Sequence, residues 1–264
     1  MKKTVGIFDS GLGGLTAAYE FERLFGGKRY IYFGDTARVP YGSKSADTIR
    51  RYAVQDTNFL LSKGASLIIA ACGTVSANAM EALRQRFSIP VIGVVEPAAE
   101  KAAKIAADGK GKVLVLGTEA TVKSGAYERA ISAIDSKICV RSVACPMFVP
   151  LVENGYTKGE AAELFVREYL ASYVDFGADA VILGCTHYPH LSETIGSFLK
   201  GSELVNSGRE AAEAVSALIS AEDAMDGKAE FYVSDTPESF ARLAGVFLKR
   251  DAKEGVERID IESY

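Results

Sequence analysis

Short apolar runs rich in β-branched residues alternate along the chain with longer segments of helical periodicity. The short runs are typical of buried strands, and the longer segments are typical of amphipathic helices. The predicted strands are Thr4–Phe8, Arg29–Phe33, Ser66–Ala71, Val91–Val94, Lys112–Leu116, Lys137–Val143, Asp179–Leu183, Glu203–Val205 and Glu230–Val233. The predicted helices include Ser45–Ser62, Val75–Arg86, Pro97–Ala107, Gly159–Tyr173 and Arg209–Ser220. Because strand–helix–strand alternation implies parallel strands covered by helices on both faces, the pattern predicts an α/β fold with mostly parallel sheets.

An internal duplication divides this pattern into two similar halves. The segment Gly64–Thr74 aligns with Gly177–His187, and each contains a Gly-Ala pair, an apolar run and then a cysteine, Cys72 or Cys185. Two similar doubly wound lobes are therefore predicted. In open parallel sheets ligands bind outside the carboxyl ends of the strands. Two such lobes facing each other would enclose one site, in the cleft between the two cysteines.

Two thiols on opposite sides of one cleft suggest a particular chemistry. One thiol can remove a proton from one face of a substrate while the other delivers a proton to the opposite face, which is what inversion of a carbon stereocentre requires. A free thiol, with a pKa of about 8.5, is close enough to neutral to serve once its neighbours tune it. The chain has 2 histidines, His187 and His190, and both lie close to Cys185. Asp9 ends the first predicted strand, where its carboxylate is able to face Cys72.

Composition narrows the classes of protein that remain. The 264 residues are 48% apolar and 24% charged, which is typical of a globular chain with one large or two small domains. Thirty basic and 34 acidic residues give a net charge of −4 and no basic cluster, so no nucleic-acid partner is expected. The longest apolar runs, such as Leu67–Cys72 and Ala180–Leu183, are too short to span a membrane. With 4 cysteines and no secretory signal pattern, we expect a cytoplasmic protein with free thiols.

Metal and dinucleotide sites are not favoured by the motifs. Cys185, His187 and His190 are spaced like metal ligands, but no fourth ligand is apparent and Pro189 interrupts the run. The glycine-rich segment 11–14 follows a strand, but Thr16 stands where a dinucleotide motif has Gly or Ala. We interpret that segment as a helix N-terminus that binds a substrate carboxylate. No cofactor and no metal are expected.

Each candidate also has a structural interpretation. Asp9 is able to cap the following helix, and His187 to bond only to backbone in its loop. His190 is expected at a helix start or on the surface. Cys139 and Cys145 are expected to pack in the core, since free cysteine is among the most buried residue types.

Several segments, in order and spacing, resemble the signature segments of the glutamate racemases. They are Asp9–Leu15 (Asp-Ser-Gly-Leu-Gly-Gly-Leu), Pro40–Gly42, the segment around Cys72, and Gly184–Pro189 (Gly-Cys-Thr-His-Tyr-Pro). The resemblance runs from Gly6 to about Gly208. It implies a cofactor-independent isomerase of the aspartate/glutamate racemase family, which interconverts L- and D-glutamate through two thiols and supplies D-glutamate for peptidoglycan, and hence for cell-wall biogenesis and cell shape.

The resemblance also implies a role for each matching residue. Cys72 and Cys185 would be the acid/base pair, with Asp9 and His187 as their proton-handling partners. Glu153 resembles a further acid near the second thiol. The implied substrate-binding residues are Ser10, Pro40, Tyr41, Gly42, Gly73, Thr74, Thr121, Glu153 and Thr186. One lobe would comprise residues 1–95 plus 208–264, with Asp9 and Cys72, and the other residues 96–207, with Cys185 and His187.

One position departs from the family. The family's usual Cys-Asn-Thr reads Cys72-Gly73-Thr74 in this chain, so a side-chain amide is missing. Loss of one hydrogen bond costs about 0.5–1.5 kcal/mol. Two alternatives therefore stay open: a racemase of another small acidic substrate such as aspartate, and a catalytically silent two-lobed amino-acid-binding protein. Association into a homodimer is also left open by the sequence.

Overall fold

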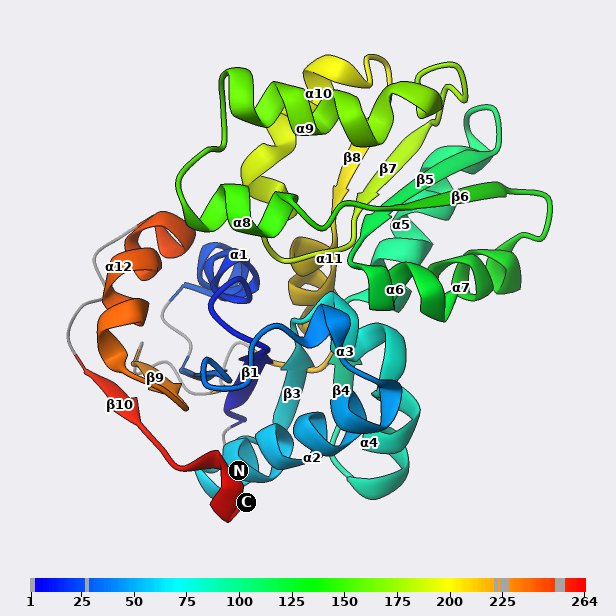
Figure 1. Cartoon of the computed structure of the whole chain (residues 1–264). Helices are drawn as coiled ribbons and strands as arrows, with labels where there is room; N and C mark the ends of the chain where they lie inside the picture. The colour runs from blue at the N-terminus through cyan, green and yellow to red at the C-terminus, as the bar shows by residue number, and fades with distance from the viewer. Residues whose placement is uncertain (1–2, 27–28, 221–222, 224–227, 250–254) are drawn as a thin grey trace.

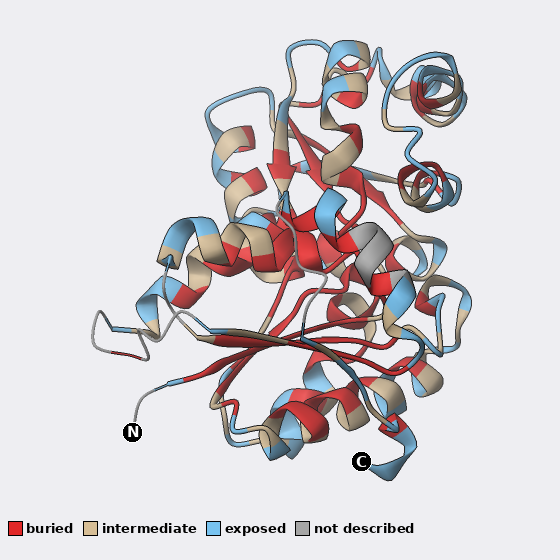
Figure 2. Cartoon of the chain, turned by 90° about the vertical axis from the view of Figure 1, so that its left-hand side faces the viewer, coloured by how far each residue is buried: buried red, intermediate tan, exposed pale blue. Residues whose placement is uncertain are grey.

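The chain folds into an α/β structure built on two parallel sheets (Figure 1). The computed structural model describes residues 3–26, 29–220, 223, 228–249 and 255–264. Helices lie on both sides of each sheet, and the strands between them are mostly buried (Figure 2). The fold class predicted from alternation and duplication, two lobes with parallel sheets, is confirmed.

The first sheet has six strands in the order β10-β9-β2-β1-β3-β4, and all of its pairs are parallel. Its strands are β1 (Val5–Asp9), β2 (Tyr30–Gly34), β3 (Leu67–Ala70), β4 (Val91–Gly93), β9 (Ala229–Val233) and β10 (Val256–Arg258). In the register of β1 with β3, Phe8 lies opposite Ala70. Asp9 and the residues that follow Ala70 therefore reach the same carboxyl edge.

The second sheet has four parallel strands in the order β6-β5-β7-β8. These are β5 (Lys112–Gly117), β6 (Cys139–Ala144), β7 (Ala180–Leu183) and β8 (Glu203–Asn206). Leu116 pairs with Leu183, so residues 118 and 185 both lie just past the carboxyl edge. The strands of the first sheet come from residues 5–93 and 229–258, and those of the second from residues 112–206. The lobe boundaries at residues 95 and 208 stay a prediction.

Twelve α-helices are assigned in the described part of the chain. They are α1 (Leu15–Phe25), α2 (Ala46–Ser62), α3 (Gly73–Asn78), α4 (Met80–Arg86), α5 (Val95–Ala107), α6 (Glu119–Ser124), α7 (Ala126–Ile134), α8 (Phe148–Glu153), α9 (Glu160–Leu170), α10 (Ser192–Phe198), α11 (Ser207–Ala214) and α12 (Pro237–Leu248). Helix α1 packs against α11 and α12, and α5 packs against α7 and α11. One hydrophobic cluster draws residues from both sheets, so the lobes share part of their core.

The sequence pattern predicted nine of the ten strands assigned among the described residues, but several details differ. Strand β10 was not predicted, because it is a short edge strand with two charged, exposed residues and no apolar run. The helix predicted over Val75–Arg86 is two helices, interrupted at Ala79 where the backbone leaves helical geometry. Helices α6, α7, α8, α10 and α12 were not predicted, whereas α1 begins directly after the glycine-rich segment that the sequence analysis interpreted as a helix N-terminus. The prediction that Cys139 packs in the core is wrong, because β6 is an edge strand and Cys139 is exposed on it, whereas Cys145 is buried.

Phe59 joins three parts of the first lobe and allows a test of the packing. Its fully buried ring lies 5.0 Å from Phe33, 5.1 Å from Tyr232 and 5.2 Å from Tyr264, centroid to centroid. We expect Phe59→Ala to lower the free energy of unfolding by about 3–5 kcal/mol, because it removes a large buried ring and leaves a cavity. Leu164→Ala, at a side chain on α9 that is 57% exposed, should stay within about 0.5 kcal/mol of the parent. Urea unfolding measures both, and a loss below about 1 kcal/mol for Phe59→Ala would contradict the packing.

Candidate active site

A cavity of about 460 Å³ lies where the carboxyl ends of the two sheets face each other. All predicted site residues except Thr121 line it, namely Asp9, Ser10, Pro40, Tyr41, Gly42, Cys72, Gly73, Thr74, Glu153, Cys185, Thr186 and His187. Its volume is in the range typical of small-molecule sites. The structure therefore brings residues from distant parts of the chain into a single cavity.

The two cysteines occupy equivalent places in the two sheets. Cys72 follows the end of β3 by two residues, and Cys185 follows the end of β7 by the same interval. Both strands are interior strands of their sheets and run parallel to their neighbours. Residues after parallel strands gather at one edge. Each sheet thus presents one thiol to the shared cavity, as the duplication predicted.

The Cys72 thiol lies in a buried, hydrogen-bonded setting beside a carboxyl group. Its Sγ donates to Ser10 Oγ at 3.4 Å. Burial, reinforced by the nearby Asp9 charge, raises the pKa of the Cys72 thiol to about 12. Cys72 therefore holds its proton at neutral pH and needs a base beside it to become a thiolate.

Asp9 is placed to be that base. Its carboxyl is 1% exposed, and Oδ2 accepts a hydrogen bond from the Gly11 N–H at 2.9 Å. The other oxygen, Oδ1, has no hydrogen-bond partner among the described residues. Burial raises the pKa of Asp9, against the opposing influence of the His187 charge and of backbone N–H groups. A buried carboxylate with one unused oxygen and an elevated pKa is suited to accept a proton.

The Cys185 thiol has a different neighbour, an imidazole. His187 Nδ1 lies 4.0 Å from Cys185 Sγ, and its Nε2 lies 3.1 Å from Glu153 Oε1. Burial lowers the pKa of His187, but hydrogen bonds with Cys185 and Glu153 and the charges of Cys185 and Asp9 outweigh burial and raise it to about 10. His187 therefore carries a positive charge beside the Cys185 sulfur across the neutral range. One thiol faces a carboxyl group and the other an imidazolium.

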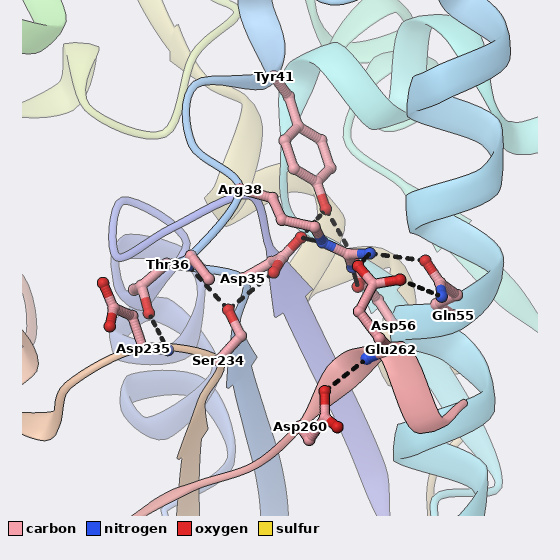
Figure 3. A network of polar contacts seen from close by, with 11 residues as sticks. Asp35, Thr36, Arg38, Tyr41, Gln55, Asp56, Ser234, Asp235, Asp260 and Glu262 are labelled. Carbon is pink, nitrogen blue, oxygen red and sulfur yellow. Dashed lines mark hydrogen bonds and ion pairs between the residues drawn. The ribbon is translucent and has the colours of Figure 1, made fainter.

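A buried polar network positions the loop with Pro40, Tyr41 and Gly42 (Figure 3). Arg38 Nε donates to Asp35 at 2.6 Å and Arg38 Nη2 donates to Asp56 at 3.1 Å. The Tyr41 hydroxyl contacts the same two carboxyl groups. Burial, reinforced by the Asp35 charge, raises the pKa of Asp56 well above its usual range. Although Tyr41 lines the cavity, its hydroxyl is engaged in this network.

Thr121 does not line the cavity but contacts a residue that does. Its hydroxyl contacts Thr118 Oγ1 at 3.0 Å, and Thr118 Oγ1 in turn contacts Thr74 Oγ1 at 3.0 Å. Thr118, which lines the cavity, caps α6 by accepting from the Thr121 N–H. The sequence analysis did not predict Thr118. This residue directly follows β5, and residues at the carboxyl ends of parallel strands gather at one edge of the sheet, so the rule that places Asp9 in the cleft applies to Thr118 equally. The sequence analysis also missed the wall formed by Pro146, Val149 and Pro150 after β6.

Comparisons with known proteins agree with this geometry. A family model described as Asp/Glu/Hydantoin racemase matches residues 20–215. The glutamate racemase of Geobacter metallireducens is 44% identical over 93% of this chain and 93% of its own length, and that of Thermus thermophilus is 42% identical over 99% and 98%. The crystal structure of the Francisella tularensis glutamate racemase with D-glutamate matches at a TM-score of 0.91 and 33% identity, covering 100% of this chain and 99% of that one.

The chain belongs to the Asp/Glu/hydantoin racemase family. It is therefore an isomerase, as the resemblance implied. A Thermus thermophilus glutamate racemase structure in complex with β-chloro-D-alanine is similar at a TM-score of 0.87 and 40% identity, covering 100% and 99% of the two chains. Within the described residues no helix is long and apolar enough to cross a membrane, and no group of three or more candidate ligands is arranged to hold a metal ion.

The position that departs from the family's usual sequence has a structural explanation in this racemase. A Cβ built on Gly73 would lie 2.1 Å from the carbonyl oxygen of Gly184, which precedes Cys185 in the other lobe. No side chain fits there unless the backbones move apart. Gly13 is equally tight, since its Cβ would lie 2.4 Å from His187 Nδ1. Both glycines allow the lobes to approach closely at the thiols.

The ion pair of His187 with Glu153 predicts a pH effect. The folded-state pKa of about 10 exceeds the usual value of 6.5, so protonation of His187 stabilises the fold fully below pH 6.5, and this contribution is lost as the pH rises towards 10. Glu153→Gln should lower the His187 pKa, because it removes the negative charge. The pH range over which protonated His187 stabilises the fold should then become narrower. Glu160→Gln, at an exposed residue that does not line the cavity, is the control. NMR titration of the imidazole measures the pKa, and an unchanged value in Glu153→Gln would contradict the pairing.

Proposed function

We propose that the protein interconverts L- and D-glutamate by acid/base chemistry of two thiols, and so supplies D-glutamate for peptidoglycan. The observation that carries the proposal is the placement of Cys72 and Cys185, one from each sheet, in one cavity. The similarity to glutamate racemases at 44% and 42% identity supports glutamate as the substrate. The proposal assigns the protein to the cytoplasm and includes no cofactor and no nucleic-acid partner. A homodimer, which the sequence left open, is not part of it.

In the proposed reaction one sulfur, as a thiolate, takes the α-proton, so an S–H bond forms and the C–H electron pair stays on the α-carbon. The S–H bond of the opposite cysteine then breaks and its proton forms a C–H bond on the other face. Asp9 accepts the Cys72 proton before a turnover that begins at that thiol, and His187 exchanges a proton with Cys185. In keeping with the family resemblance, Cys72 with Asp9 acts on D-glutamate, and Cys185 with His187 acts on L-glutamate.

Substrate binding in this proposal depends on hydroxyl and backbone groups. No lysine or arginine is among the described residues that line the cavity, so side-chain ammonium and guanidinium groups do not hold the two carboxylates. The available side-chain donors include the hydroxyls of Ser10, Ser43, Thr74, Thr118 and Thr186. We assign Ser10, Thr74 and Thr186 to the substrate, as expected from the sequence, and replace Thr121 by Thr118. Thr121 acts in this proposal by orienting the Thr118 hydroxyl.

Serine variants test the two-thiol proposal. Cys72→Ser and Cys185→Ser should each reduce glutamate racemisation at least about a thousandfold while the protein stays folded, because a hydroxyl is a far poorer proton carrier than a thiol at neutral pH. Chiral chromatography of the products measures the rate in both directions, and circular dichroism checks the fold.

Cys139→Ser is the matched control, because Cys139 is an exposed thiol outside the cavity, and it should keep the parent activity. Substantial racemisation by either Cys72→Ser or Cys185→Ser would refute the two-thiol mechanism. Activity of the parent protein on aspartate, with none on glutamate, would keep the mechanism and replace the substrate.

Gly73→Ala tests the close approach of the lobes. The added methyl would meet the Gly184 carbonyl oxygen at 2.1 Å, so the backbones must separate and the thiols move away from their working positions. Overpacking of this kind costs about 1–3 kcal/mol, which predicts a fall in kcat/KM of roughly 5- to 150-fold. Gly73→Asn should be at least as damaging.

Gly196→Ala on α10 is the control for Gly73→Ala, because its added methyl would meet only Leu204 at an ordinary 3.5 Å. Steady-state kinetics of the three variants measure kcat and KM. A lower KM for glutamate in Gly73→Asn would show instead that the missing amide limits binding in this chain.

A further inference from the structure

The loop that carries Cys185 and His187 is held from behind by residues of the other lobe. Thr16, a buried residue on α1, donates its hydroxyl hydrogen to the carbonyl oxygen of Thr186 at 2.9 Å. Thr186 stands between Cys185 and His187, so this bond fixes the peptide groups that connect the thiol to its imidazole. Helix α1 follows β1 of the six-stranded sheet, whereas the loop follows β7 of the four-stranded sheet.

His190 completes the contact from the same loop. Its Nε2 lies 3.3 Å from Thr16 Oγ1. A threonine hydroxyl has one hydrogen, and Thr16 gives it to Thr186, so the Thr16 oxygen accepts from a His190 that carries its proton on Nε2. Burial, together with the charges of His187 and Lys249, lowers the pKa of His190 to about 4. His190 is thus a neutral donor, which distinguishes it from the cationic His187.

Phe247 on α12 covers both imidazoles. Its ring centroid lies 5.3 Å from that of His187 and 4.7 Å from that of His190, in edge-to-face arrangements with interplanar angles of 85° and 87°. Helix α12 packs beside α1 (Figure 1). The Phe247 ring restricts rotation of the His187 ring, and the absence of a side chain at Gly13, just before α1, leaves room for the imidazole.

We propose that Thr16 and His190, assisted by Phe247, are positioning residues that clamp the Cys185–His187 loop to the first lobe and set the orientation of the His187 imidazole toward the Cys185 sulfur. None of the three lines the cavity, so they act through His187 and not on the substrate. The kinetic consequence rests on the proposed racemase function. The clamp serves the Cys185 side of the reaction alone, because the Cys72 side has its own partner in Asp9.

Thr16→Val tests the clamp, because it removes both hydrogen bonds at nearly constant volume. We expect kcat/KM to fall about tenfold, since two ordinary hydrogen bonds are lost. The fall should be equal for both enantiomers, because the equilibrium constant fixes the ratio of kcat/KM in the two directions. With α-deuterated substrates, the isotope effect should rise for L-glutamate, whose proton Cys185 removes, and fall for D-glutamate. Thr16→Ser should restore the parent behaviour. Thr57→Val, which removes a buried hydroxyl bonded to the Ala53 carbonyl oxygen at 2.8 Å, should leave both isotope effects unchanged.

A merely stabilising role for Thr16 predicts unchanged isotope effects, and that result would overturn the proposal, as would failure of Thr16→Ser to restore them. If Thr16→Val does not fold, His190→Leu gives the same test, with a smaller fall because the bond from Thr16 to Thr186 remains. Its isotope effects should shift in the same directions, and parent values would refute the clamp.

Imidazole NMR tests the clamp without any activity, and the chain's 2 histidines make the spectrum simple to assign. The parent should show a neutral His190 with its proton on Nε2 at pH 7, and Thr16→Val should change the His190 tautomer balance and the His187 signals. Parent-like spectra in Thr16→Val would refute the clamp. If the parent protein is inert toward glutamate but Thr16→Val still changes the imidazole spectra, the proposed function is refuted and the clamp stands.

Discussion

Two parallel sheets that meet at their carboxyl ends are the constraint on which the rest of the site depends. Parallel strands bring the residues that follow them to one edge, and here two such edges share a cavity. Cys72 after β3 and Cys185 after β7 therefore face the same space although they are far apart in the sequence. Asp9 at the end of β1 and Thr118 after β5 reach the cavity by the same geometry. A cavity with one thiol on each side is thus a direct consequence of the topology.

The electrostatics of the cavity are less symmetric than its backbone. Burial keeps the Cys72 thiol protonated at neutral pH, because it disfavours the charged form. Cys72 is assisted by a buried carboxyl group with one unused oxygen, and Cys185 by an imidazolium that Glu153 supports. A reversible reaction needs an acid and a base on each side, and two different partners meet that need. Gly73 and Gly13 allow the two lobes to approach closely beside these groups.

Much of this arrangement could be predicted from the sequence. Apolar runs predicted nine of the ten strands assigned among the described residues, and the duplicated Gly-Ala and cysteine pattern predicted the positions of both thiols. Other features depend on contacts that no local pattern records. Thr121 and Thr118 are both polar residues near the start of one helix, and only the turn of that helix decides that Thr118 faces the cavity. The hydroxyl of Tyr41 is engaged by Asp35 and Asp56, and Gly73 meets Gly184 across the cleft.

Hydrogen exchange at the α-carbon during early turnover in deuterated water tests the central claim most directly, since two thiols on opposite faces should not share their protons. Starting from L-glutamate, we predict that the D-glutamate formed carries deuterium at the α-carbon while the remaining L-glutamate stays protiated, and that the converse holds from D-glutamate. Deuterium that appears in the recovered substrate as fast as in the product would indicate a single base serving both faces. That result, or the absence of deuterium from both enantiomers, would contradict the account.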